Sequence, residues 1–236
     1  PVVSNYINQM NSTTIATDYE QKISHLSEEQ ENAMIKQAQD YNESLIGTGS
    51  ITDPFSESNE NQTEDDVYNN LLKIDDTGMM GYIDIPKLDV VIPVYHGTSE
   101  EVLKKGVGHM EGSALPIGGV GNRSFLLAHT GMNTSRMFSD LTGLSEGDLF
   151  YIRVLNMSLT YCVCEIQTLL PEEADHLYPD DNRDLISLVT CTPYGVNTHR
   201  LIVTEVRVSA ADVKKVDVPV TTADWNGSVW MRAYMN

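Results

Sequence analysis

Short β-type segments fill the chain from residue 81 to residue 208 and constrain its fold more than any other feature. Each segment is rich in Val, Ile, Leu and Tyr and is bounded by Gly, Pro, Asn or Asp, the pattern of strands joined by turns. Short helical stretches at residues 100–105 and 135–141 interrupt them. Strands this short and closely spaced are typical of closed barrels rather than alternating βαβ units. We therefore predict a mainly β fold, a closed or nearly closed barrel over residues 79–210, followed by a C-terminal extension over 211–236. The segments read GYIDIP, VVIPVY, SFLLAH, DLFYIRV, LTYCVCEIQTLL, LISLVTC and RLIVTEVRV.

The N-terminal residues carry a helical pattern instead. Ser27 and Gln30 have the form of a capping box that begins a second helix, and Gly47 stands where that helix would end with a C-terminal cap. We predict a helical hairpin over residues 1–47, packed on the barrel. The apolar positions of its first helix recur with helical spacing: Ile15, Tyr19, Ile23 and Leu26.

Residues 48–78 are rich in Ser, Asn, Glu and Asp and include SESNENQTEDD. Such a composition buries too little apolar surface to order itself, and long loops in compact proteins are commonly either disordered or functional. Within it, Asp53 and Pro54 form a turn pair, followed by Phe55, an aromatic side chain that favours a covered position. We interpret the segment as an acidic lid loop with a short helix, the alternative being a flexible linker.

The charge balance narrows the choice of partners. With 15 Lys and Arg against 34 Asp and Glu, the formal charge is -19. Nothing supplies the basic patch that phosphates require, so this charge disfavours nucleic acid and anionic membrane surfaces as partners. It favours a basic partner or serves solubility. No apolar run reaches the length of about 18 residues that a transmembrane helix needs, and no signal-peptide pattern is present.

Three cysteines, Cys162, Cys164 and Cys191, are an odd number and too few for a disulfide framework, so at least one thiol is free. Cys162 and Cys164 fall on the same face of a predicted strand, which is poor disulfide geometry. We interpret both as packing residues of that strand.

We expect no metal and no cofactor. Cys162 and Cys164 lack the C-x-x-C spacing of zinc ligands. Asp180, Asp181 and Asp184 read as a solvated acidic loop rather than a calcium site.

Cys191 is the candidate nucleophile. It closes the apolar run 185–190, and Pro193 cannot donate to a strand ladder, so the strand ends within two residues. A cysteine at the end of a rigid element becomes a nucleophile when a base or a positive charge stabilises its thiolate. The alternative is a buried structural cysteine.

The base must come from six histidines. His25 and His176 lie in polar surroundings and read as solvated, whereas His96 and His109 adjoin glycines in predicted loops and stay candidates. His129 ends an apolar run, as Cys191 does, so it also emerges at a strand terminus. Catalysis needs this kind of rigid placement.

Either His199 or Arg200 faces Cys191, because strand alternation sends the two side chains to opposite faces. Arg200 would supply a fixed cation that stabilises the thiolate and an oxyanion on the substrate. Both faces of this strand carry apolar residues, so periodicity leaves the choice open. Thr190, just before Cys191, either positions the substrate through its hydroxyl or is a packed strand threonine.

The segment SLVTCTPYGVNTHRLIV closely resembles the signature around the active-site cysteine of sortases, and TCTPYGVNTHRL looks like that of class C, the pilin-polymerising sortases. Three further segments agree: residues 81–119, LLAHTGM around His129, and TDPF at residues 52–55. Together they cover most of residues 50–210. One departure is that the family often has GHRG where this chain has AHTG over 128–131, which keeps the histidine but changes its neighbours.

The resemblance implies an eight-stranded sortase β-barrel with His129, Cys191 and Arg200 as the catalytic set and His199 left out. Similar enzymes cleave an LPxTG-like sorting signal after the threonine, form a thioacyl-enzyme on the cysteine, and pass the acyl group to an amine. In class C that amine is usually a lysine of the next pilin subunit, which gives isopeptide-linked pili. A housekeeping or hydrolytic sortase and a non-enzymatic binding barrel are the alternatives.

The resemblance also implies a role for the lid and a location. Class C relatives hold an Asp-Pro-aromatic motif in the active site, so Asp53 would pair with Arg200 while Phe55 covers Cys191. We expect a soluble fragment of a membrane-anchored protein at the extracellular face of a Gram-positive cell membrane.

Overall fold

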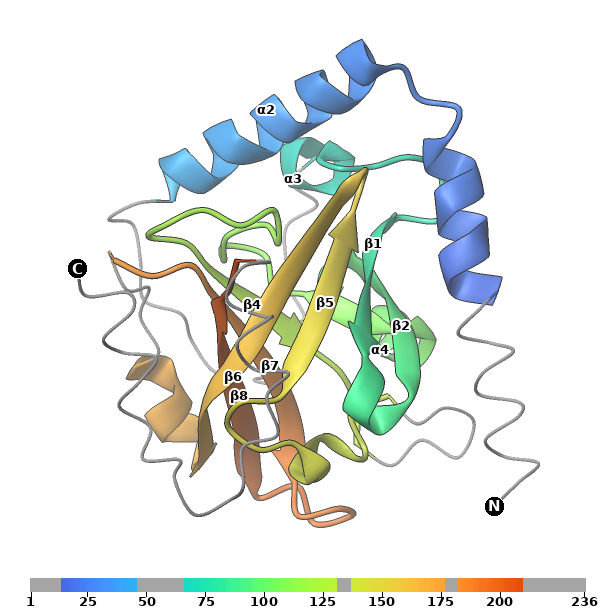
Figure 1. Cartoon of the computed structure of the whole chain (residues 1–236). Coiled ribbons are helices and arrows are strands. Elements are labelled where there is room, and N and C mark those ends of the chain that lie inside the picture. Colours follow the sequence, from blue (N-terminus) through green and yellow to red (C-terminus); the bar gives the residue numbers. More distant parts are fainter. Residues whose placement is uncertain (1–13, 46–65, 131–136, 177–181, 210–236) are drawn as a thin grey trace.

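In a computed structural model, the eight strands of the described residues form one closed barrel (Figure 1). The structure describes residues 14–45, 66–130, 137–176 and 182–209. The strands are β1 Met79–Ile85, β2 Val90–His96, β3 Val107–His109, β4 Arg123–Leu127, β5 Leu149–Val154, β6 Met157–Leu169, β7 Leu185–Thr192 and β8 His199–Arg207.

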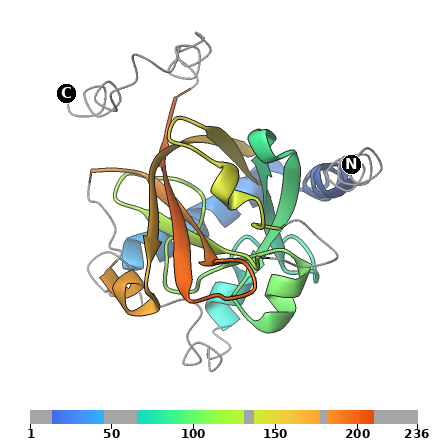
Figure 2. The ribbon, with the colours of Figure 1, turned by 90° about the horizontal axis from the view of Figure 1, so that it is seen from below.

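The barrel order is β1-β2-β3-β4-β7-β8-β6-β5, and the predicted mainly β barrel is confirmed. Two neighbouring pairs, β2 with β3 and β4 with β7, run parallel, whereas the other pairs are antiparallel. Figure 2 shows the barrel from below. Strand β4 pairs with β7, which comes much later in the chain. This pairing brings the end of β4 next to the end of β7.

Short helices lie between the strands in the sequence and before β1. The predicted stretch at 100–105 is α4 Glu100–Lys105, which begins at the N-cap Ser99. At 135–141, the described part is a turn followed by a 3-10 helix, Leu141–Gly143. A five-residue helix, α3 Asp66–Asn70, precedes β1.

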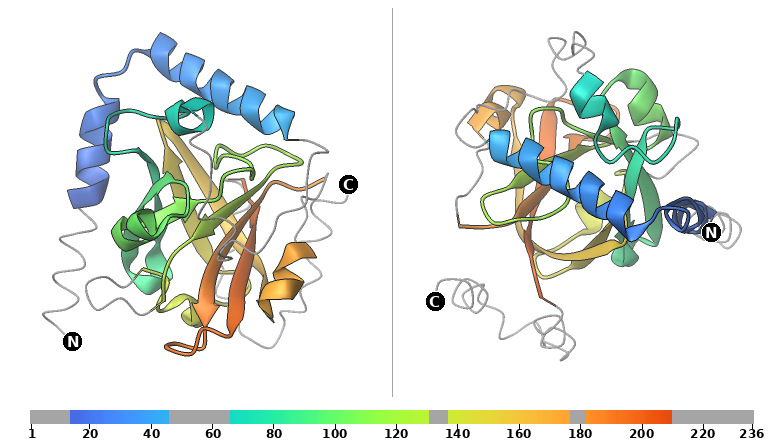
Figure 3. Two further views of the ribbon diagram at one scale, coloured as in Figure 1. Left: turned by 180° about the vertical axis from the view of Figure 1, so that it is seen from behind. Right: turned by 90° about the horizontal axis from the view of Figure 1, so that it is seen from above.

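Two N-terminal helices are present, as predicted, over residues 14–23 and in α2 Glu28–Ser44. The capping box is confirmed, because the Ser27 hydroxyl accepts the Gln30 N–H and the Gln30 side chain accepts the Ser27 N–H. The two helices lie against different parts of the barrel: α2 crosses one end, and the helix over 14–23 runs along a side (Figures 1 and 3). They therefore pack on the barrel more than on each other. The predicted cap Gly47 lies outside the described residues.

Buried hydrogen bonds tie each helix to the barrel. The Tyr19 hydroxyl donates to Met80 O at 3.0 Å and accepts the Leu155 N–H at 2.7 Å. From α2, the Asn42 amide donates to Leu115 O at 3.2 Å and accepts its N–H at 2.7 Å. Buried polar groups need such partners, so these two side chains set where the helices dock.

The apolar core has two parts. The larger cluster fills the barrel and continues under the N-terminal helices. A smaller cluster lies between α4 and strands β4, β7 and β8, and includes Val189 and Ile202, each two residues from Cys191 and Arg200 along their strands. Because alternate residues share a face, this cluster is the apolar base beneath the end of β7 and the start of β8. Its buried members are Leu103, Met110, Phe125, Leu127, Val189 and Ile202.

Glu205 on β8 is fully buried, and neither of its carboxylate oxygens has a hydrogen-bond partner. Burial raises the pKa of this carboxyl well above its usual range, and the charge of Arg123 opposes the shift. Arg123 itself is buried and donates to the Ser187 and Thr204 hydroxyls at 3.0 and 3.1 Å. The folded protein therefore keeps Glu205 protonated at a pH where the unfolded chain has lost that proton.

We expect Glu205→Gln to stabilise the protein at pH 7.5 and the gain to shrink toward pH 4. Above about pH 4.5 the folded state binds more protons at this site than the unfolded state, so wild-type stability falls as pH rises. Thermal unfolding should show a rise of about 3 °C or more in Tm at pH 7.5. Glu146→Gln, at an exposed position, is the control and should change neither the Tm at pH 7.5 nor its dependence on pH. A lower Tm for Glu205→Gln at pH 7.5 would show that the buried carboxylate is ionised and paired.

Candidate active site

Cys191 and Arg200 face each other across neighbouring strands. They are register partners in the antiparallel pair of β7 and β8, and Arg200 Nη1 lies 3.6 Å from Cys191 Sγ. The six residues of β7 before Cys191 are buried, and Cys191 is the first that is half-exposed. The sulfur is thus presented at the end of a rigid, buried strand, with a cation beside it.

Arg200 is held from two sides. Its side chain is buried, with 7% of the residue exposed, and its Nη1 also donates to Asn197 O in the β7–β8 turn at 3.4 Å. The turn itself closes through the Val196 and Asn197 N–H groups, which donate to Pro193 O at 3.0 and 2.9 Å. His199 instead pairs with Thr192, and its Nδ1 lies 2.9 Å from the Thr198 hydroxyl. Strand register thus answers the question that sequence periodicity left open, in favour of Arg200.

His129 lies two residues beyond β4, where β4 and β7 run parallel. The last register partners are Leu127 and Val189, and the Ala128 N–H donates to Val189 O at 3.2 Å. Continuing this register by two residues leads from Leu127 to His129 and from Val189 to Cys191. The two predicted site residues therefore leave the sheet at the same edge, from adjacent strands.

Glu100, the first residue of α4, contacts His129. Its Oε1 lies 3.6 Å from His129 Nε2, and its Oε2 lies 3.0 Å from Lys104 Nζ. The Lys104 hydrogen bond is the main cause that lowers the pKa of Glu100, and charge on His129 adds to it. Glu100 is exposed, so solvent weakens this contact. Sequence reasoning missed Glu100, since nothing in the sequence places α4 beside the end of β4.

Thr190 is only 2% exposed, and its hydroxyl donates to Ala128 O at 2.7 Å. Thr130, which sequence reasoning also missed, donates its hydroxyl to Cys191 O at 2.7 Å. The two hydroxyl oxygens are 2.6 Å apart. Of the two roles considered for Thr190, the geometry favours a packed strand threonine over a substrate contact, because its one proton is bonded within the protein.

His96 and His109 differ from expectation, since they end strands β2 and β3 and are buried rather than in open loops. The ring nitrogens of His109 lie 2.8 Å from the Tyr68 hydroxyl and 2.9 Å from Ala114 O. Burial lowers the pKa of His109 to about 4, so the ring is neutral near pH 7. His96 is likewise held, by Leu71 O at 2.7 Å. Neither histidine is accessible to a substrate, which leaves His129 as the candidate base.

The other two cysteines are free and buried or half-buried. Their predicted common face is altered by an irregularity in the pairing of β6 with β8 between Val163 and Glu165, which leaves Cys164 without a register partner. Burial raises the pKa of the Cys162 thiol to about 11 and that of Cys164 to about 12. Both are therefore protonated at neutral pH.

The predicted lid residues Asp53, Pro54 and Phe55 lie outside the described residues, as do Asp180 and Asp181. Within the part of the chain that the structure describes, no three His, Cys, Asp or Glu side chains gather as metal ligands. In that same part, the helices are all too short or too polar to cross a membrane.

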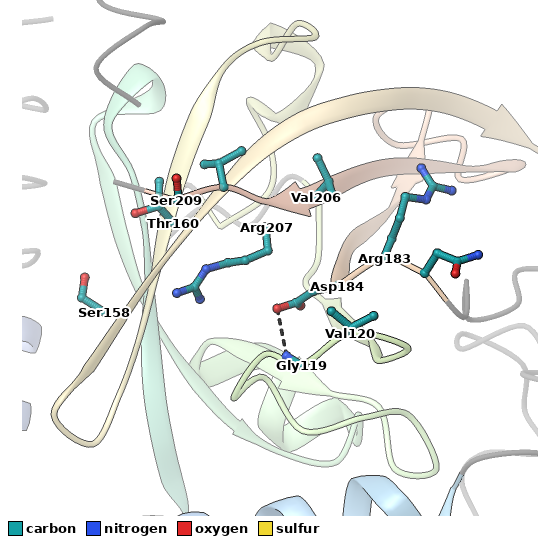
Figure 4. A pocket seen from close by; sticks show the side chains of 11 residues that line it. Gly119, Val120, Ser158, Thr160, Arg183, Asp184, Val206, Arg207 and Ser209 are labelled. Atoms are coloured by element: carbon teal, nitrogen blue, oxygen red, sulfur yellow. Dashed lines mark hydrogen bonds between the residues drawn. The ribbon is translucent and has the colours of Figure 1, made fainter. Parts of the chain in front are cut away.

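A pocket of about 480 Å³ lies at the opposite end of β7 and β8 from Cys191 (Figure 4). Asp184 and Arg207 extend into it, and Asp184 accepts hydrogen bonds from the Gly119 N–H at 2.8 Å and the Tyr161 hydroxyl at 2.9 Å. Burial raises the pKa of Asp184. The expectation of a solvated acidic loop is therefore wrong for Asp184, which joins strands at the barrel end.

The family model described as "Sortase domain" matches residues 83–208, more than half of the chain. Sortase C1 from Streptococcus agalactiae is 42% identical with a TM-score of 0.74, covering 82% of this chain and 97% of that one. Sortase C from Streptococcus pneumoniae is 35% identical with a TM-score of 0.74, covering 83% and 97%.

Curated relatives are more distant. Sortase A from Bacillus anthracis is 26% identical over 130 residues, which are 55% of this chain and 60% of that protein. Sortase A from Streptococcus agalactiae is 28% identical over 129 residues, which are 53% of this chain and 51% of that protein. The chain thus spans little more than half the length of the curated relatives it matches. The barrel order, the matched family model and the solved structures agree, and the chain belongs to the sortase family.

Proposed function

We propose that this chain is a cysteine transpeptidase of the pilin-polymerising type, which cleaves an LPxTG-like sorting signal and transfers the acyl part to a lysine amine of a pilin subunit. The observation that carries the proposal is the 3.6 Å approach of Arg200 Nη1 to Cys191 Sγ at the end of β7. Membership of the sortase family and the likeness to solved class C sortases support it.

In the acylation step, the Cys191 thiolate attacks the carbonyl carbon of the scissile amide. A C–S bond forms and negative charge moves to the carbonyl oxygen. Arg200, beside the sulfur, stabilises the thiolate and then the oxyanion. His129 gives a proton to the leaving amine as the C–N bond breaks, and a thioester remains on Cys191.

In the transfer step, the lysine amine attacks the thioester and gives its proton to His129. The C–S bond then breaks and Cys191 leaves as the thiolate. One amide bond is exchanged for an isopeptide bond with no change in oxidation state, so the proposed reaction uses no cofactor. The partners in this proposal are pilin subunits that carry both a sorting signal and an acceptor lysine.

Two further observations bear on partners and location. The Streptococcus pneumoniae sortase C that this chain resembles was described in terms of its pilin substrate specificity. The formal charge of -19 favours basic partner surfaces such as those around a lysine acceptor. We propose that the protein is anchored in the cell membrane of a Gram-positive bacterium and acts at its extracellular face.

The test is to incubate the purified protein with a sorting-signal peptide and a lysine-bearing pilin peptide and to analyse the products by mass spectrometry. An isopeptide-linked product supports the proposal. A free carboxylate as the only product, or transfer to a cell-wall amine but not to lysine, would favour the hydrolytic or housekeeping sortase. The curated relatives, which are sortase A proteins, make this alternative worth separating.

The lid belongs to the same proposal. In the resting enzyme, Asp53 pairs with Arg200 and Phe55 covers Cys191, with Pro54 fixing the turn between them. Support comes from the sequence TDPF and from the position of the Arg200 guanidinium next to the sulfur, where a carboxylate and a ring could reach both.

We expect Phe55→Ala and Asp53→Ala each to raise the rate at which a thiol reagent labels Cys191 at neutral pH. The labelling rate follows the fraction of molecules with an uncovered sulfur, so the gain should be severalfold. Ser56→Ala, in the same segment, is the control. Unchanged labelling in both lid variants would remove the lid from the proposal.

A further inference from the structure

Side-chain hydroxyl groups continue the hydrogen bonding between β4 and β7 beyond the last backbone hydrogen bond. The Ala128 N–H still donates to Val189 O, at 3.2 Å. Beyond it, the Thr190 hydroxyl donates to Ala128 O at 2.7 Å, and the Thr130 hydroxyl donates to Cys191 O at 2.7 Å. The two residues that flank His129 are therefore each bonded to β7, one to Thr190 and one to Cys191.

From this geometry we propose that Thr130 is a positioning residue, which acts with Thr190 as a clamp that holds His129 next to Cys191. The inference rests on the proposed function, in which His129 transfers protons. We call the two threonines, Thr130 and Thr190, the hydroxyl clamp.

The count of protons supports a structural use of both hydroxyls. Each threonine carries one hydroxyl proton, and three short contacts compete for the two: to Ala128 O, to Cys191 O, and between the two Oγ1 atoms at 2.6 Å. No donor is left over for a substrate. Both hydroxyls are thus used within the protein, where they link the backbone at Ala128 and at Cys191.

Within the described residues, the polar contact of the His129 side chain is weak. Its side-chain contact with the exposed Glu100, at 3.6 Å, is solvent-screened. Proton transfer requires heavy atoms within about 3 Å, and a displacement of about 1 Å can lower a rate roughly 100-fold. A backbone tied on both sides of His129 limits how far the ring can move from Cys191.

The clamp also gives a role to Thr130, the residue at which this chain departs from the GHRG pattern of sortases. Thr130 stands where the resemblance led us to expect an arginine. A threonine at this position has the short hydroxyl that reaches Cys191 O at 2.7 Å. The backbone of the nucleophile and the backbone of the base are thereby joined through one side chain.

The test compares Thr130→Val, which removes the hydroxyl at constant shape, with Thr130→Ser, which keeps it. Two rates are measured: acylation of the enzyme by a sorting-signal peptide in a single turnover, and alkylation of Cys191 by iodoacetamide at alkaline pH, where its rate no longer rises. Acylation needs a proton for the leaving amine, whereas alkylation of the thiolate does not. A misplaced His129 therefore affects only the first.

We expect Thr130→Val to slow acylation by about 10- to 100-fold and to leave alkylation within about twofold of wild type. Thr130→Ser should restore acylation to within about threefold. The control is Thr204→Val, which removes a more deeply buried hydroxyl, on β8, that accepts from Arg123. This variant should lower Tm without changing acylation.

Two results would overturn the clamp: wild-type acylation by Thr130→Val, or an equal loss of acylation and alkylation, which would mean that the hydroxyl supports Cys191 and not His129. His129→Ala separates this failure from failure of the proposed function. If His129→Ala is inactive while Thr130→Val is normal, only the clamp is wrong. If His129→Ala acylates at the wild-type rate, both the clamp and the proposed function are wrong.

Discussion

Cys191→Ala is expected to abolish both the acyl adduct and the ligated product when the protein is incubated with a sorting-signal peptide and a lysine acceptor. The proposed reaction runs through a thioester on this sulfur, and alanine cannot form it. Removing a covalent nucleophile typically lowers turnover by about 10⁴-fold or more, to the limit of detection. Mass spectrometry of the intact protein measures the adduct directly, because wild type should gain the mass of the acyl fragment.

Cys162→Ala and Cys164→Ala are the matched controls. Burial raises the pKa of these thiols to about 11 and about 12, so neither supplies a thiolate at neutral pH. Each variant should keep turnover within about threefold of wild type, with any change appearing in Tm as lost packing. An adduct that persists in Cys191→Ala and disappears in Cys164→Ala would move the nucleophile and contradict the proposed site.

Most strands of the barrel could be predicted from sequence because each is a run of β-branched and aromatic residues between turn residues. Strand β3 could not be predicted, since it has only three residues with Gly108 in the middle. It is defined by its pairing with β2 and β4. The break in register at Cys164 was also hidden, because alternation assumes an unbroken period of two. Local pattern thus predicts elements, whereas pairing with distant neighbours decides the short and irregular ones.

In the candidate site, too, some features could be predicted from local pattern and others depend on distant pairing. The positions of Cys191 and His129 were predictable because each closes an apolar run, so each lies at or just beyond the end of a buried strand, whereas their catalytic roles stay proposals. The contacts of Thr130 with Thr190 and Cys191 were not, since they join residues about sixty positions apart through the parallel pairing of β4 and β7. The lid residues lie outside the described structure, so their role stays a prediction.

The choice between Arg200 and His199 leads to the second large expected effect. In the ladder, Cys191 pairs with Arg200 while Thr192 pairs with His199, and the guanidinium approaches the sulfur to 3.6 Å. As the thiolate attacks, negative charge moves from sulfur to the carbonyl oxygen, two bonds away. A planar guanidinium with several N–H donors can serve both atoms without moving.

We therefore expect Arg200→Met to lower kcat/KM by roughly 100- to 1,000-fold, the loss typical of removing one oxyanion donor. Arg200→Lys keeps the charge but loses the planar fork, so it should recover part of the activity. His199→Ala, one residue away on the other face of β8, should stay within about threefold of wild type. Steady-state kinetics with the sorting-signal peptide measures all three, with Tm as the check on folding.

Comparison of the three variants separates a catalytic role of Arg200 from a structural one. Arg200 is buried and bonded to Asn197 O, so some loss of stability in Arg200→Met is expected. If Arg200 had only a structural role, its replacement would lower activity by lowering the fraction of folded protein. The activity of Arg200→Lys would then be set by its Tm and not by the retained charge. A larger loss in His199→Ala than in Arg200→Met would instead assign the residue that serves Cys191 to the opposite face of the strand, against the register observed.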